Sequence, residues 1–112
     1  MTDCLFCKIV RKEIPAREVL RDEHVVAFHD LNPQAPHHVL VIPTVHADQL
    51  TAFASAATGA QAASLLAAAA EIGGTFPDGY RVVVNTGKDG GQTVGHLHFH
   101  VLGGRQMTWP PG

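Results

Sequence analysis

Residues 95–104 read GHLHFHVLGG, and the alternation of histidines with large apolar residues predicts a β-strand. Successive side chains of a strand point to opposite faces, so His96, His98 and His100 would share one face while the apolar residues fill a core on the other. Neighbouring histidines would lie roughly 7 Å apart at their Cα atoms, because each residue advances about 3.3 Å. On a helix the same residues would spread around the circumference, so a strand fits both periodicities better.

The shared face of three histidines admits three interpretations. It could be a partly exposed polar face, although Thr or Lys would serve equally well there. His-X-His on a strand could begin a zinc site with an open catalytic position. One imidazole could instead attack phosphorus while its neighbours orient it and bind phosphate oxygens. The preceding loop contains Gly87, Gly90, Gly91 and Thr93, which suits an anion cradle and favours the last interpretation.

Composition limits the class of protein. The chain has 112 residues, which is enough for a single domain over residues 1–112 with one modest core. Its formal net charge is −2 and it has no run of Lys or Arg, so we expect neither nucleic acid nor a membrane as a partner. Residues 51–70 are uncharged, but 11 of these 20 are Ala, which favours a helix outside the membrane. The first residues show no secretory signal pattern, so the expected location is cytoplasmic.

The remaining patterns predict an α+β domain with an antiparallel sheet. A long Ala-rich helix is expected from residue 49, with its break at Gly59 and its end at Gly73-Gly74. A short helix or turn is expected over residues 4–12. The expected strands cover residues 17–20, 24–30, 38–42, 80–84 and 96–102.

Residues 96–102 match the pattern His-φ-His-φ-His-φ-φ and resemble the histidine-triad family of nucleotide hydrolases and transferases. The similarity to the Hint branch of this family covers nearly the whole chain except the Ala-rich helix. The segments that match the Hint branch are Phe6-Cys7-Lys8-Ile9, Glu13-Ile14-Pro15, Ala27-Phe28-His29-Asp30, Pro33-Gln34-Ala35-Pro36, Asn85, Gly90-Gly91-Gln92, Gly103-Gly104-Arg105 and Trp109-Pro110-Pro111-Gly112. The dinucleoside-polyphosphate hydrolase branch shares the triad but is not similar in the last two of these segments.

The resemblance implies a fold and an activity. The implied HIT-like fold is a five-stranded antiparallel sheet with one long and one short helix, paired as a homodimer. The implied enzyme is a purine nucleoside phosphoramidase, which hydrolyses the P–N bond of adenosine or guanosine 5′-phosphoramidates through a covalent nucleotidyl-histidine. Its ligands would be purine nucleoside monophosphates and phosphoramidates. The alternative is a nucleotide-binding regulatory or interaction module with little turnover.

Residue roles follow from the resemblance position by position. His98 would be the nucleophile, His38 and His100 would complete a hydrogen-bonded histidine cluster, and Thr93 would donate near the leaving group. Thr93 stands where Ser is usual and Gly95 where a bulkier residue is common, which bears on selectivity and rate. Asp30 would bind the ribose hydroxyls and Trp109 would reach the active site of a partner subunit. The base pocket would be formed by Leu5, Phe6, Ile9, Phe28 and Leu31, and the phosphate and ribose region by Asn85, Gly91 and Val94.

Cys4 and Cys7 form a Cys-x2-Cys motif, for which a cytosolic disulfide is not expected. Zinc would require two more ligands, which His46 and His96 could supply. Several histidine-triad relatives are similar in holding zinc with these four positions. Such a site would be closed and structural, so the chemical step would need no metal. The competing interpretations are two buried reduced thiols or a catalytic zinc hydrolase.

Overall fold

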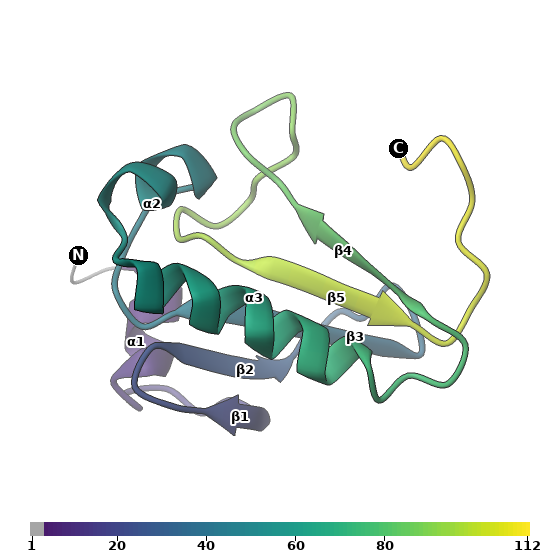
Figure 1. Ribbon diagram of the computed structural model, residues 1–112, viewed down its shortest axis with the longest axis horizontal. Helices are drawn as coiled ribbons and strands as arrows, with labels where there is room; N and C mark the ends of the chain where they lie inside the picture. Colours follow the sequence, from purple (N-terminus) through teal and green to yellow (C-terminus); the bar gives the residue numbers. More distant parts are fainter. Residues whose placement is uncertain (1–3) are drawn as a thin grey trace.

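The computed structural model describes residues 4–112, in which five strands form one antiparallel sheet of order β1-β2-β3-β5-β4 (Figure 1). This arrangement confirms the predicted α+β fold with a five-stranded antiparallel sheet. The strands are β1 (Glu18–Arg21), β2 (Val25–His29), β3 (His37–Pro43), β4 (Tyr80–Val84) and β5 (Phe99–Gly103). The helices are α1 (Leu5–Val10), α2 (Leu50–Ala56) and α3 (Gly59–Gly73).

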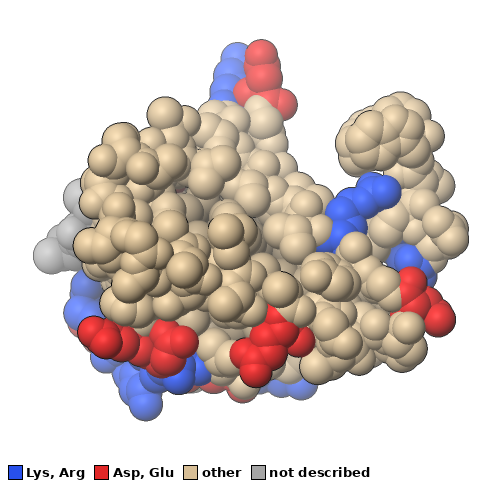
Figure 2. Space-filling model, viewed as in Figure 1, with Lys and Arg blue, Asp and Glu red and all other residues tan. Residues whose placement is uncertain are grey.

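The outer face over α3 carries little charge. Figure 2 shows acidic and basic side chains mainly along the rim of this face, while its centre is uncharged. Among the residues described there, the view shows no large basic patch. Within residues 4–112, no helix combines the length and the apolar character that crossing a membrane requires.

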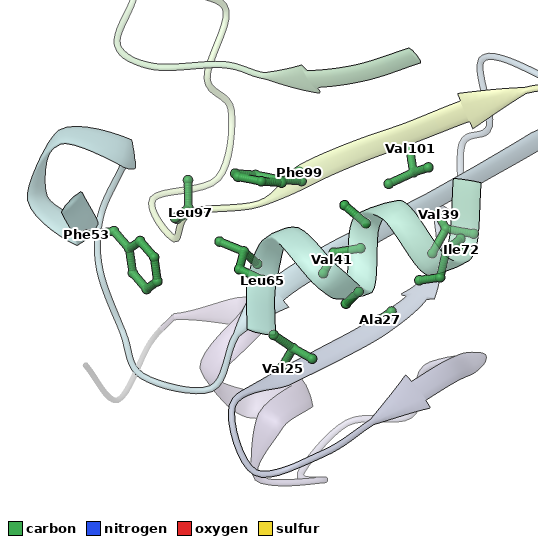
Figure 3. Close-up of a cluster of buried hydrophobic side chains, with 12 residues drawn as sticks. Val25, Ala27, Val39, Val41, Phe53, Leu65, Ile72, Leu97, Phe99 and Val101 are labelled. Atoms are coloured by element: carbon green, nitrogen blue, oxygen red, sulfur yellow. The ribbon is translucent and has the colours of Figure 1, made fainter. Parts of the chain in front are cut away.

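The sheet separates two hydrophobic clusters. On one face, Leu65 and Ile72 of α3 pack with Val41 and Val101 of the central strands (Figure 3). Ala68 and other small residues of α3 allow the helix to approach the sheet closely. On the opposite face, α1 covers the second cluster, which consists of Phe6, Ile9, Val26, Phe28, Leu40 and Ile42. His38 of β3 and His100 of β5 lie on this second face.

The Ala-rich segment forms two helices where one interrupted helix was predicted. Thr58 is the N-cap residue of α3 and forms a capping box with Gln61. The Thr58 hydroxyl accepts the Gln61 N–H at 3.1 Å, and the Gln61 side chain accepts the Thr58 N–H at 2.8 Å. The break therefore precedes Gly59, which is the first residue of α3. The predicted end at Gly73 is confirmed, with Gly74 as the C-cap. Residues 4–112 thus contain two short helices and one long helix.

The last strand begins three residues later than predicted, at Phe99. Its neighbour β3 ends at Pro43, which has no N–H to continue the ladder. The Leu97 N–H donates to the Ala47 carbonyl instead, at 2.8 Å. The alternation of side chains still holds across the irregular segment, because Leu97 is buried in the α3 cluster while His96 faces the other side.

Candidate active site and metal cluster

His38 and His100 meet across the pairing of β3 and β5. Leu40 lies opposite His100 in the register, so His38 is the diagonal neighbour of His100 on the same face. His38 Nε2 and His100 Nδ1 are 2.9 Å apart. The β-sheet register therefore brings together two residues that are 62 positions apart in the chain.

Backbone hydrogen bonds determine the tautomers of these two imidazoles. The Gln34 N–H donates to His38 Nδ1 at 3.0 Å, so a neutral His38 carries its proton on Nε2. That Nε2–H donates to His100 Nδ1, which leaves the His100 proton on Nε2. His100 consequently presents an N–H donor at the end of a chain of hydrogen bonds that starts at the Gln34 backbone.

His98 has the opposite tautomer to His38 and His100. Its Nδ1–H donates to the His96 carbonyl at 2.8 Å, because a carbonyl oxygen can only accept. The lone pair is therefore on Nε2, which has no hydrogen-bond partner among the residues that the structure describes. The rings of His98 and His100 lie 5.0 Å apart between centroids. A nucleophilic nitrogen thus lies beside a hydrogen-bond donor, the arrangement required for attack on phosphorus with stabilisation of a phosphate oxygen.

Cys4, Cys7, His46 and His96 form a second group, called here the four-donor cluster. Their ligand atoms all lie within 4.8 Å of one another. The Nδ1 atoms of the two histidines are 3.2 Å apart, Cys7 Sγ is 3.2 Å from His46 Nδ1, and Cys4 Sγ is 3.3 Å from His96 Nδ1. The predicted four metal-ligand positions are therefore adjacent in space.

Both histidines of this cluster direct lone pairs inward. His96 Nε2–H donates to the Pro43 carbonyl at 3.0 Å, and His46 Nε2–H donates to the Asp48 carboxylate at 2.7 Å. Two inward lone pairs at this distance repel each other unless a cation lies between them. Tetrahedral zinc bond lengths would separate two nitrogens by about 3.4 Å and a nitrogen from a sulfur by about 3.6 Å. Donor set, distances and supporting acceptors therefore fit zinc, and all four positions are supplied by the protein.

Another possible ligand set, formed by Asp30, His38 and His100, also has ligand atoms within 4.8 Å of one another. Asp30 Oδ2 lies 3.4 Å from His38 Nε2. The Gln34 N–H holds His38 in the tautomer that has a proton on Nε2, and a metal at this nitrogen would have to displace that proton. The hydrogen bonds therefore favour a chain of proton donors here and a metal at the four-donor cluster.

Burial favours neutral imidazoles on this face of the sheet. It lowers the pKa of His38, and it lowers the pKa of His96 and of His100 to about 4, with nearby histidine charges adding to the effect. Burial raises the pKa of the Cys7 thiol, and the neighbouring Cys4 thiol raises it further. Neutral imidazoles can accept protons or attack phosphorus at neutral pH.

An apolar wall adjoins His98. The Phe6 ring lies edge-on to the His98 ring at 5.2 Å and to the Phe28 ring at 5.5 Å. Ile9 belongs to the same buried cluster. Leu5 is half exposed and Leu31 is 96% exposed, so the structure does not bring these two predicted base-pocket residues into the wall.

The loop between β4 and β5 carries the remaining predicted contacts. Asn85 Nδ2–H donates to the Gly90 carbonyl at 2.7 Å, and Gly91 adopts a φ of +77°, which favours glycine. Thr93 is exposed, and Val94 packs against the α1 cluster. Trp109 is 81% exposed on the C-terminal tail, which extends away from the sheet (Figure 1). Nothing within residues 4–112 brings Trp109 to the histidines of its own chain.

Sequence analysis missed the residues that orient the histidines. Gln34 acts through its backbone N–H, and Asp48 through a carboxylate bound to His46. No sequence pattern marks a backbone donor. Asp48, however, lies two residues after a candidate ligand, a spacing that could have suggested a supporting acceptor.

Comparison with known proteins identifies the family. The family model of the HIT domain matches residues 11–107, so the chain belongs to the HIT family. A zinc-binding protein of 14 kDa from Zea mays is 49% identical over 112 residues, which cover 96% of this chain and 87% of the relative. Proteins of this family bind nucleotides and are generally nucleotide hydrolases or transferases.

Solved structures agree with that family. A HIT family hydrolase from Legionella pneumophila is 46% identical with a TM-score of 0.89, covering 98% of this chain and all of the other. A histidine triad protein from Clostridium difficile is 39% identical with a TM-score of 0.85, covering 96% of each chain. The chain is therefore similar in sequence and in fold to a HIT family hydrolase. Its own four-donor cluster has a geometry that could hold a metal ion.

The lowered pKa of His100 predicts acid sensitivity of folding. An unfolded imidazole gains a proton below its ordinary value of 6.5, whereas folded His100 resists protonation until about pH 4. The unfolded state then binds more protons in this window, so the free energy of unfolding decreases as the pH falls through it. Denaturant titrations across the window should give a shallower dependence for His100→Asn than for wild type. Equal slopes for wild type and His100→Asn would contradict the assignment.

Proposed function

We propose that the chain hydrolyses nucleoside 5′-phosphoramidates, as a member of the Hint branch of its family. The observation that carries this proposal is the orientation of His98, whose Nδ1–H is held by the His96 carbonyl while Nε2 is left free. The motif segments at Gly103-Gly104-Arg105 and at residues 109–112 support the Hint branch. The adjoining wall of Phe6 and Phe28 suits a purine base.

The proposed reaction has two displacements at phosphorus. His98 Nε2 attacks the α-phosphorus, the P–N bond breaks, and the amine leaves with a proton that the exposed Thr93 hydroxyl relays from solvent. The imidazole becomes cationic in the nucleotidyl-histidine, and the His96 carbonyl stabilises its Nδ1–H. Water then attacks phosphorus and releases a proton to solvent, the P–N bond to His98 breaks, His98 leaves as the neutral imidazole, and the nucleoside monophosphate is released. His100 Nε2–H would bind a non-bridging phosphate oxygen in both steps.

Substrate contacts are proposed for the remaining residues of the site. Asp30 Oδ1 already accepts the Asn32 N–H at 2.8 Å, which orients the carboxylate for ribose hydroxyls. Phe6, Ile9 and Phe28 would contact the base. Leu5 and Leu31 would contact the base only if they moved onto the bound ligand. Asn85, Gly91 and Val94 would contact the phosphate and the ribose.

Turnover of adenosine 5′-phosphoramidate tests the proposed nucleophile. His98→Ala should reduce kcat/KM by at least about a thousand-fold, because the covalent route loses its attacking group. His24→Ala, which alters a histidine outside the site, should keep wild-type activity. Normal binding of adenosine monophosphate with negligible turnover in both wild type and His98→Ala would instead favour the nucleotide-binding regulatory module.

We also propose that the four-donor cluster holds a structural zinc ion. The ion would tie α1 to the sheet through Cys4 and Cys7, and the chemical step would not use it because all four of its positions are taken by protein ligands.

Metal analysis tests this site. Protein purified without chelators should contain about one zinc ion per chain, whereas Cys7→Ser should lose most of it and His24→Ala none. A chelator should lower zinc content and thermal stability together. Rapid loss of turnover with stability unchanged would favour the catalytic zinc hydrolase instead.

A homodimer is the third proposal. The edge strand β4 has one unpaired side, and Tyr80 and Val82 on it are 45% and 39% exposed. The exposed tail with Trp109 could then reach a second subunit. Light scattering should give twice the mass of one chain. Val82→Lys should shift the mass toward one chain, while Val19→Lys on the opposite edge strand should not; a wild-type mass of one chain would exclude the dimer.

A further inference from the structure

Gln92 makes three side-chain hydrogen bonds to the backbone. Its amide Nε2 donates to the Asp48 carbonyl at 2.6 Å and to the Val94 carbonyl at 3.0 Å. Its Oε1 accepts the Gly87 N–H at 3.2 Å. Both amide hydrogens and one lone pair are therefore used, and the side chain is partly buried.

These bonds fix a glycine-rich loop that makes few other hydrogen bonds to the rest of the described chain. The loop over residues 85–95 contains four glycines, which lose much conformational entropy when the chain folds. Its other hydrogen bonds stay within the loop: Asn85 to Gly90, and the backbone bonds of residues 87–92. Within the described part of the chain, the bond from Gln92 to Asp48 is the one hydrogen bond that joins this loop to a distant segment.

The distant segment belongs to the four-donor cluster. The Asp48 carboxylate accepts from His46 Nε2 at 2.7 Å, and the Asp48 carbonyl accepts from Gln92. Thr93 directly follows Gln92 and leads toward His98. The Gln92 side chain therefore links Asp48, which accepts a hydrogen bond from His46 of the four-donor cluster, to the loop that would contact phosphate.

We propose that Gln92 is a positioning residue that orders the phosphate-contacting loop and couples nucleotide binding to metal retention at the four-donor cluster. This inference rests on the proposed nucleotide site. The coupling must be reciprocal, so a nucleotide that orders the loop should also slow the loss of metal.

The first measurement is the affinity for adenosine monophosphate. Gln92→Met keeps the length of the side chain without adding charge and removes all three hydrogen bonds. Affinity should fall about ten-fold, with KM for the phosphoramidate rising more than kcat falls. Gln61→Met is the matched control, since it removes a side-chain hydrogen bond at the α3 cap outside both sites. It should leave nucleotide affinity unchanged.

The second measurement is the rate of zinc transfer from zinc-loaded protein to a chromogenic chelator. Adenosine monophosphate should slow this transfer about five-fold in wild type and in Gln61→Met, and should have no effect in Gln92→Met. A folding defect alone would speed zinc loss with and without nucleotide, and would leave the ratio unchanged.

The outcomes separate this inference from the proposed hydrolysis. Equal nucleotide affinity, or equal slowing of zinc transfer, in wild type and Gln92→Met would overturn the role of Gln92 while leaving the hydrolase intact. Absence of turnover in wild type with the affinity and coupling differences present would overturn the hydrolase and support Gln92. A wild-type protein that binds neither nucleotide nor zinc would overturn both.

Discussion

β3 and β5 pair antiparallel at the centre of the sheet, with Leu40 opposite His100. This register places His38 and His100 within hydrogen-bond distance on the α1 face. It turns Val39, Val41, Phe99 and Val101 toward α3. A slip by one residue would invert both faces at once. The packing of α3 on one face of the sheet therefore fixes the strand register, and the register fixes the distance between the histidines on the other face.

The pair of His46 and His96 differs from the pair of His38 and His100 in the hydrogen bonds of the ring nitrogens. His46 and His96 donate outward, to Asp48 and Pro43, so their lone pairs face each other beside two thiols. His38 instead accepts from a backbone N–H, so its proton faces His100. The hydrogen bonds thereby orient identical side chains in a way that suits metal binding in one place and proton donation in another. His96 belongs to both regions, because its ring faces the thiols and its carbonyl orients His98.

Much of the fold could be predicted from local pattern. The alternation around His98 identified the two faces, and the Cys-x2-Cys motif with His46 and His96 identified four residues that the structure places together. The start of β5 could not be predicted from residues 95–104, since it depends on Pro43 in a neighbouring strand. The division between α2 and α3 lies one to two residues before the predicted Gly59, because the Thr58 capping box makes this glycine the first residue of α3.

The sequence by itself determined which residues face the core, which face carries histidines, and which donor types are available, because these follow from side-chain identity and the two-residue period of a strand. Tertiary structure alone decided the protonated nitrogen of each imidazole. The deciding acceptors and donors lie far along the chain, as with His96 and the Pro43 carbonyl, which are 53 residues apart. It also decided that Leu31 is exposed and that Gln92 reaches Asp48, 44 residues away. Hydrogen bonds between distant segments form only after the sheet and its helices fix their separation, so no local pattern encodes them.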